Sequence, residues 1–81
     1  APELVPDGGT FGGQTDITIT VPENCKVYYT WDSSDPSAAS TEYTAPIPVP
    51  EGNNVLSVIA IDQNTGKCSD IYRSRFEFYM N

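Results

Sequence analysis

Apolar side chains recur at every second position in several short runs of this chain. The clearest run lies between Thr15 and Val21, where Ile17 and Ile19 alternate with polar residues. Successive side chains of a strand point to opposite faces of a sheet, so this spacing predicts a half-buried strand. No stretch shows the 3.6-residue period of an amphipathic helix. The pattern therefore predicts an all-β fold.

The run from Val27 to Trp31 predicts a central strand, because β-branched and aromatic side chains suit a pleated, half-buried surface. Short polar residues from Asp32 to Pro36 follow it, which is typical of a tight loop. We expect the side chains of Asp32 and Asp35 to cap this turn. Calcium binding and acid–base catalysis are the alternatives, but two carboxylates supply neither the six to eight oxygens of a calcium site nor a cleft.

The second half of the chain indicates how the strands form layers. Pro46, Pro48 and Pro50 exclude a central strand, because proline cannot donate to a sheet ladder, and they predict an edge strand or a crossing between sheets. Residues 55–61 are apolar on both faces, which is typical of a central strand whose second face is covered. Together the patterns predict a two-sheet antiparallel sandwich of six or seven strands. The expected strands are a first edge strand near Leu4–Val5 or Thr10–Phe11, and strands over 15–21, 27–31, 43–49, 55–61 and 72–79.

Length and charge restrict the class of protein. The 81 residues are expected to form one domain with a single thin core, in which residues 1–9 are a linker that enters the edge strand. Four basic and eleven acidic residues give a net charge of −7, which disfavours nucleic acid and anionic membranes as partners. No apolar run is long enough to cross a bilayer, and the first residues do not resemble a signal peptide. We expect a mature domain or a piece of a longer protein, monomeric in isolation.

The two cysteines, Cys25 and Cys68, are expected to begin two strands at the same end of the sandwich. A disulfide between them is the favoured interpretation, provided that their Cα atoms come within about 7 Å, and two free thiols are the alternative. The chain has no histidine and no closely spaced cysteine pair, so a zinc site is not expected. No catalytic triad, nucleophile elbow or phosphate loop is present either. We therefore expect no enzymatic activity, no cofactor and no metal.

Trp31, the only tryptophan, lies where the central strand meets its loop. Its position in the alternation places it on the core face, so it is expected to close one end of the sandwich. The alternative is that the loop turns the indole outward as a platform for a sugar ring.

The outward face of the sheet that contains the central and final strands has an unusual composition. Apolar, aromatic and arginine side chains together are enriched at protein contacts, and a solvated sheet face seldom carries so many. We expect this face to pack on a neighbouring domain; glycan binding and a merely exposed surface are the alternatives. By parity it carries Tyr28, Thr30, Ile59, Ile61, Arg73, Arg75 and Tyr79.

Several motifs follow one another along nearly the whole chain: Gly8-Gly9-Thr10-Phe11, Ile17-Thr18-Ile19, Val27-Tyr28-Tyr29-Thr30, Asp32-Ser33-Ser34-Asp35-Pro36-Ser37, Tyr43 with Pro46-Ile47, Ile59-Ala60-Ile61-Asp62 and Ser69-Asp70. In their order and spacing they resemble the chitobiase/β-hexosaminidase C-terminal domain family, which is also described as fibronectin type III-associated. The chain departs from the family at Ser33, where glycine is usual, and at Trp31, where threonine is usual. If the loop needs a positive φ at this position, serine raises the conformational free energy of the folded loop relative to glycine.

The resemblance implies an immunoglobulin-like sandwich that serves as a non-catalytic accessory module. Such modules occur in secreted or cell-surface bacterial proteins, often glycan-active ones, so the expected location is extracellular. The expected partners are neighbouring domains of the parent protein, with a polysaccharide or another cell-surface protein as further candidates. A carbohydrate-binding module that uses exposed aromatic side chains is the alternative function.

Overall fold

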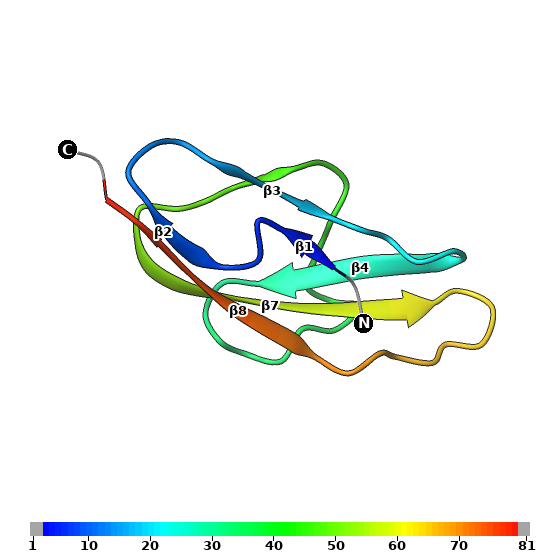
Figure 1. Cartoon of the computed structure of the whole chain (residues 1–81). Helices are drawn as coiled ribbons and strands as arrows, with labels where there is room; N and C mark the ends of the chain where they lie inside the picture. Colours follow the sequence, from blue (N-terminus) through cyan, green and yellow to red (C-terminus); the bar gives the residue numbers. More distant parts are fainter. Residues whose placement is uncertain (1–2, 80–81) are drawn as a thin grey trace.

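The computed structural model describes residues 3–79, which form two β-sheets packed face to face (Figure 1). The three-stranded sheet has the order β1-β3-β6 and the five-stranded sheet has the order β2-β8-β7-β4-β5. The predicted all-β, two-sheet fold is therefore confirmed. The described residues contain no helix that could span a membrane. The strands are β1 (Leu4–Val5), β2 (Gly9–Phe11), β3 (Asp16–Ile19), β4 (Cys25–Thr30), β5 (Thr41–Glu42), β6 (Ile47–Pro48), β7 (Gly52–Asp62) and β8 (Tyr72–Phe78).

The start of the chain contributes a strand to each sheet, and this differs from the expected pattern. β1 pairs antiparallel with β3, whereas β2 pairs parallel with β8. The described part of the chain thus has eight strands, and β2 and β8 form a parallel pair, where six or seven antiparallel strands were expected. The switch between sheets is made at Gly8 and Gly9, whose φ angles of 79° and 125° are readily adopted only by glycine. Both places proposed for the first edge strand are therefore strands, and Leu4 of β1 belongs to the core.

The two longest antiparallel pairings of the five-stranded sheet join β7 to β4 and to β8. β7 is therefore central, as its apolar character on both faces predicted. Alternate side chains of β3, β4, β7 and β8 point between the two sheets, where they form the core. Its buried members are Leu4, Ile17, Ile19, Val27, Ile47, Val49, Leu56, Val58, Ala60, Phe76 and Phe78.

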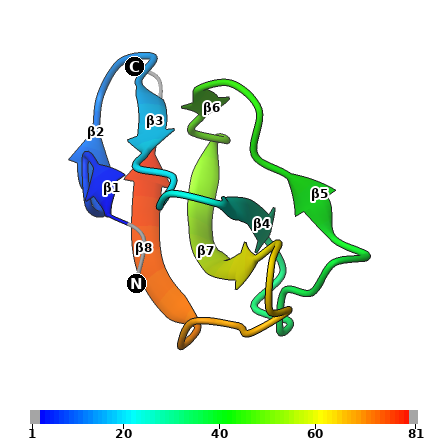
Figure 2. The same ribbon diagram turned by 90° about the vertical axis from the view of Figure 1, so that its right-hand side faces the viewer.

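The proline-rich segment after β5 crosses from the five-stranded sheet to the three-stranded sheet and there forms the short edge strand β6, so both expectations for it are confirmed (Figure 2). Tyr43 connects the two sheets in this crossing. Its backbone N–H donates to the carbonyl oxygen of Val27 in β4 (2.7 Å), and its hydroxyl oxygen accepts a hydrogen bond from the backbone N–H of Ile19 in β3 (3.1 Å). One side chain thus satisfies a backbone donor of the opposite sheet.

We expect Tyr43→Phe to lower the free energy of unfolding by about 1–2 kcal/mol, because it leaves the N–H of the buried residue Ile19 without its acceptor. Urea denaturation measures this change, and the amide hydrogen of Ile19 should exchange faster in the variant. Tyr79→Phe is the control, since Tyr79 is half exposed and lies beyond the last strand. A loss of stability equal to that of the control would contradict the assigned role of Tyr43.

Candidate functional site

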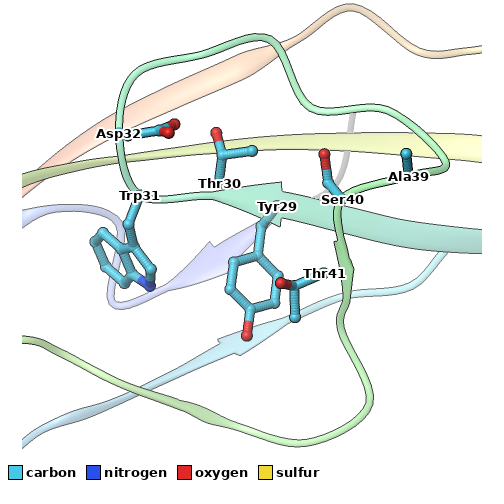
Figure 3. Close-up of a pocket in the computed structure, with 7 residues that line it drawn as sticks. All are labelled: Tyr29, Thr30, Trp31, Asp32, Ala39, Ser40 and Thr41. Atoms are coloured by element: carbon cyan, nitrogen blue, oxygen red, sulfur yellow. The ribbon is translucent and has the colours of Figure 1, made fainter.

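An open hollow of about 410 Å³ lies at the end of β4, beside the chain that leads into β5 (Figure 3). The pairing of β4 with β5 stops at Tyr29 and Thr41, and beyond this pair the two segments diverge. The hollow occupies the space between them. Its lining residues are Tyr29, Thr30, Trp31 and Asp32 on one segment, and Ala39, Ser40 and Thr41 on the other.

Trp31 packs against the edge of the core and also lines the hollow. Its ring meets that of Phe76 edge to face, with centroids 6.0 Å apart and an interplanar angle of 75°. It is half-buried, so the expected packing on the core face is observed while part of the indole remains accessible. The rings of Trp31 and Tyr29 point to the same side of β4, as their two-residue spacing requires (Figure 3).

Asp32 caps the turn that follows β4, as predicted. Its Oδ1 atom accepts hydrogen bonds from the backbone N–H of Ser34 (3.1 Å) and from the hydroxyl of Ser34 (2.6 Å). These bonds stabilise the charged carboxylate and hold the pKa of Asp32 below its ordinary value of 3.8. Ser33, between the two residues, has a φ of 65°. The loop therefore adopts a left-handed conformation at a residue that carries a Cβ atom.

Asp35 has a different role from the one predicted. Its Oδ1 atom accepts a hydrogen bond from Nη2 of Arg73 in β8 at 2.6 Å, and the two side chains form an ion pair. No hydrogen bond from this carboxylate to the turn is present in the described part of the chain. Asp35 thus fastens the loop to the sheet rather than capping it.

The loop after β4 lies over the outward face of the five-stranded sheet. Thr30, Ser57 and Arg73 stand side by side on β4, β7 and β8. The hydroxyl of Thr30 donates to the carbonyl oxygen of Ser34, and Arg73 reaches Asp35. Ser57, between these anchors, is fully buried, and its Oγ atom has no hydrogen-bond partner. The loop therefore provides the cover that the second face of β7 was expected to need.

This cover changes the outward face that the sequence predicted as a contact surface. Ile59 is only 7% exposed, so the prediction that its side chain is accessible on the outward face is wrong. Tyr28, Thr30 and Ile61 are half-buried. Arg73 is exposed but is paired with Asp35, whereas Arg75 and Tyr79 are exposed. The accessible part of the predicted surface is therefore smaller and more polar than expected.

The structure does not contain the predicted disulfide, and Cys25 and Cys68 are both free thiols. Cys25 pairs with Asp62 on one side of β7, and Cys68 pairs with Ile61 on the other side. Two interstrand spacings separate their Cα atoms by about 9–10 Å, beyond the ~7 Å limit of a disulfide. In addition, Cys25 packs on the core, whereas Cys68 is exposed. The two residues do share one end of the sandwich, but β7 lies between them.

A hydrogen-bonded group that sequence reasoning missed attaches the first loop to β8. Asp7 accepts hydrogen bonds from the hydroxyl of Tyr72 (2.5 Å) and from the hydroxyl of Ser74 (2.9 Å). The bond to Asp7 and partial desolvation raise the pKa of the Tyr72 hydroxyl. Tyr72 and Ser74 share one face of a strand, but no sequence signal joins them to an aspartate so distant in the chain.

The hollow is lined by aromatic, hydroxyl and small side chains and one carboxylate. Among residues 3–79, no group of three or more potential ligands could hold a metal ion. The hollow contains a single carboxylate, that of Asp32, and Ser34 already donates two hydrogen bonds to it. What the hollow does offer is aromatic surface beside hydroxyl groups.

Replacing Ser33 with glycine should stabilise the domain by about 0.5–1 kcal/mol, because a left-handed φ strains a residue with a Cβ atom but not glycine. Urea denaturation midpoints provide the measurement. Ser33→Ala is the matched control, since it removes the hydroxyl but keeps the Cβ atom, and it should bring no gain. Equal effects of both variants would show that the backbone angle is not the cause.

Protonation of the Asp32 carboxylate should make the domain less stable in acid. A carboxyl with a lowered pKa in the folded state stabilises the fold above its unfolded value of 3.8, and this contribution is lost as the pH falls through the folded pKa. Asp32→Asn keeps an oxygen acceptor for Ser34 but cannot titrate. The stability difference between the natural chain and this variant should therefore shrink in thermal melts as the pH falls below the unfolded value of 3.8. A difference that is independent of pH would contradict this role.

Comparison with known proteins gave one match. The family model described as the chitobiase/beta-hexosaminidase C-terminal domain matches residues 6–73. No curated protein and no solved structure gave a significant match. The matched range contains every residue that lines the hollow and the complete loop after β4, but it leaves out β1 and most of β8.

Proposed function

The chain belongs to the chitobiase/β-hexosaminidase C-terminal domain family, and from this membership we propose that it is a non-catalytic accessory module that spaces or supports glycan-active domains of a secreted or cell-surface protein. The family is a C-terminal accessory domain of glycoside hydrolases. The family match over residues 6–73 is the observation that carries this proposal.

The shape and packing of the domain support a mechanical role. The sandwich is elongated, with principal extents of 46 × 21 × 16 Å. One face of the five-stranded sheet is covered by the other sheet, and the outward face is partly covered by the loop that Arg73 and Thr30 anchor. Such a rod holds its neighbours at a defined separation, because both of its layers are fixed by long-range pairings.

The ionisable side chains are engaged in surface turns and pairs, which also supports an accessory role. Asp32 is held by Ser34, Asp35 by Arg73, and Asp7 by hydroxyl groups of β8. Each of these carboxylates is held by a different partner, whereas a general acid–base pair requires two such groups free to act at one substrate bond.

The accessible remainder of the outward face is the proposed contact with a neighbouring domain. Arg75 and Tyr79 are exposed there, and Ile61 is half-buried. Aromatic and arginine side chains are enriched in protein interfaces. The contact that we propose is therefore centred on these residues and not on Ile59.

The proposed function can be tested in the natural polypeptide that carries this chain. Residues 3–79 are replaced by a glycine-serine linker, and hydrolysis of soluble aryl glycosides is compared with hydrolysis of an insoluble polysaccharide. An accessory module predicts unchanged turnover of the small substrate and reduced turnover of the polymer. Loss of activity on the small substrate, or hydrolysis of an aryl glycoside by the isolated chain, would contradict a non-catalytic role.

A further inference from the structure

The hollow at the end of β4 contains polar atoms that the protein itself does not use. Within residues 3–79, no hydrogen-bond partner is found for the indole Nε1 of Trp31, the hydroxyl of Tyr29 or the hydroxyl of Thr41. In the described part of the chain, the only buried side-chain polar atom without a partner lies elsewhere, at Ser57. The three groups in the hollow are therefore open to solvent or to a ligand, and they include both donors and acceptors.

The two aromatic rings of the hollow are held in place by the fold. The edge-to-face contact with Phe76 orients Trp31, while the pairing of Tyr29 with Val58 and Thr41 sets its position on the sheet. Residues two apart on a strand are about 6.6 Å apart, so one ring-sized ligand can contact both side chains. Figure 3 shows the two rings on the same side of β4, with Thr41 next to Tyr29. Little ordering is needed before a ligand binds, which favours affinity.

The charge of the hollow restricts the ligand. Asp32 is the only charged residue in the lining, and no basic side chain contributes to it. With a net charge of −7 for the whole chain, an anionic ligand would be repelled. Aromatic faces carry negative electrostatic potential and attract C–H groups, and the adjacent hydroxyl groups match a ligand with several hydroxyls.

We propose that this hollow binds one neutral pyranose residue of a glycan, with its C–H face against Trp31 and Tyr29 and its hydroxyls bonded to the free polar atoms of Trp31, Tyr29 and Thr41. The volume of about 410 Å³ accommodates a single sugar ring with some surrounding water. The hollow is open, so the ring can belong to a longer chain. This binding goes beyond the spacing role proposed above and does not depend on it.

The sole tryptophan makes the proposal directly testable in the natural chain. Neutral oligosaccharides, cellohexaose, chitohexaose and xylohexaose, are titrated into the ¹⁵N-labelled protein. We expect at least one of them to shift the Trp31 indole N–H resonance and the Thr41 amide resonance saturably, with a dissociation constant of about 0.1–1 mM. An acidic oligogalacturonate should cause no shift. No saturable shift with any neutral probe up to about 10 mM, or tighter binding of the acidic probe, would overturn the proposal.

Conservative variants then test the individual contacts. Thr41→Val and Tyr29→Phe each remove one hydroxyl, and each should weaken binding about 3–10-fold, the usual value of one hydrogen bond. Trp31→Phe keeps an aromatic ring against Phe76 but removes Nε1, and isothermal calorimetry should show a similar loss. Tyr79→Phe lies outside the hollow and should leave affinity unchanged. Thr41 is exposed, so its variant remains informative if either ring variant folds poorly. Unchanged affinity in both Thr41→Val and Tyr29→Phe would overturn the proposed contacts.

The two proposals fail in different measurements. If the domain binds no sugar but its replacement by the linker still reduces hydrolysis of the polymer, the binding site is refuted and the spacing role remains. Saturable sugar binding without any effect of linker replacement would refute the spacing role alone.

Discussion

Phe76→Ala should lower the free energy of unfolding by about 3–5 kcal/mol. The side chain of Phe76 is fully buried, stacks with Phe11 at a centroid distance of 6.3 Å and meets Trp31 edge to face. Its removal would leave a cavity at the centre of the core, next to the aromatic side chains of two other segments. A domain of this size has a total stability of roughly 4–12 kcal/mol, so the loss is a large share of it. Urea denaturation monitored by circular dichroism measures it.

Two variants control the interpretation of Phe76→Ala. Phe76→Leu keeps most of the buried volume and should cost clearly less. Tyr79→Ala removes an aromatic ring that is 50% exposed, and it should change stability by less than about 1 kcal/mol. If Phe76→Ala were as mild as Tyr79→Ala, the packing assigned to Phe76 would be wrong.

Gly8→Ala should destabilise the domain by about 2–3 kcal/mol, from backbone strain and a steric clash together. The φ of Gly8 is 79°, and a Cβ atom there would lie 2.8 Å from Oγ of Ser74 and 3.0 Å from the carbonyl oxygen of Arg75. The carbonyl belongs to β8 and cannot move without distorting the sheet. The hydroxyl of Ser74 is held by Asp7 at 2.9 Å. Both the switch between sheets and the attachment of the first loop should be disturbed.

Gly13→Ala is a matched control for Gly8→Ala. A Cβ atom at Gly13 meets nothing within 4 Å, and its φ is not in the left-handed region. This variant should be neutral or slightly stabilising, because alanine restricts the unfolded chain more than glycine does. Thermal melts of the two variants measure the contrast, and equal midpoints would contradict the close approach of Gly8 to β8.

The candidate site was only partly predictable. Trp31 and Asp32 were identified because an aromatic residue followed by an acidic residue ended a strand pattern. Tyr29 was recognised only as part of the predicted central strand, and the small residues around Ser40 and Thr41 gave no signal. These residues line the hollow because β4 and β5 diverge after a short pairing, and no local pattern indicates where a pairing ends.

The roles of Tyr43 and Asp35 show the same limit. The alternation of apolar residues after Tyr43 indicated an extended segment, but not that its hydroxyl meets Ile19 in the opposite sheet. Asp35 was a reasonable turn cap by residue type, yet Arg73 competes for its carboxylate from a distant strand. A sequence pattern describes which conformations a segment favours, whereas these contacts depend on which segment lies opposite.

The sequence by itself determined the all-β class, the central position of β7, the exclusion of the proline-rich segment from the centre of a sheet and the inward faces of β3 and β4. These follow from side-chain alternation and from the backbone restrictions of proline, which act within a few residues. Only the tertiary structure decided that the first segment supplies both sheets, that β7 separates Cys25 from Cys68, and that the loop after β4 covers Ser57. The reason is that strand order and loop position are set by the burial of apolar surface over the whole chain, which no local pattern encodes.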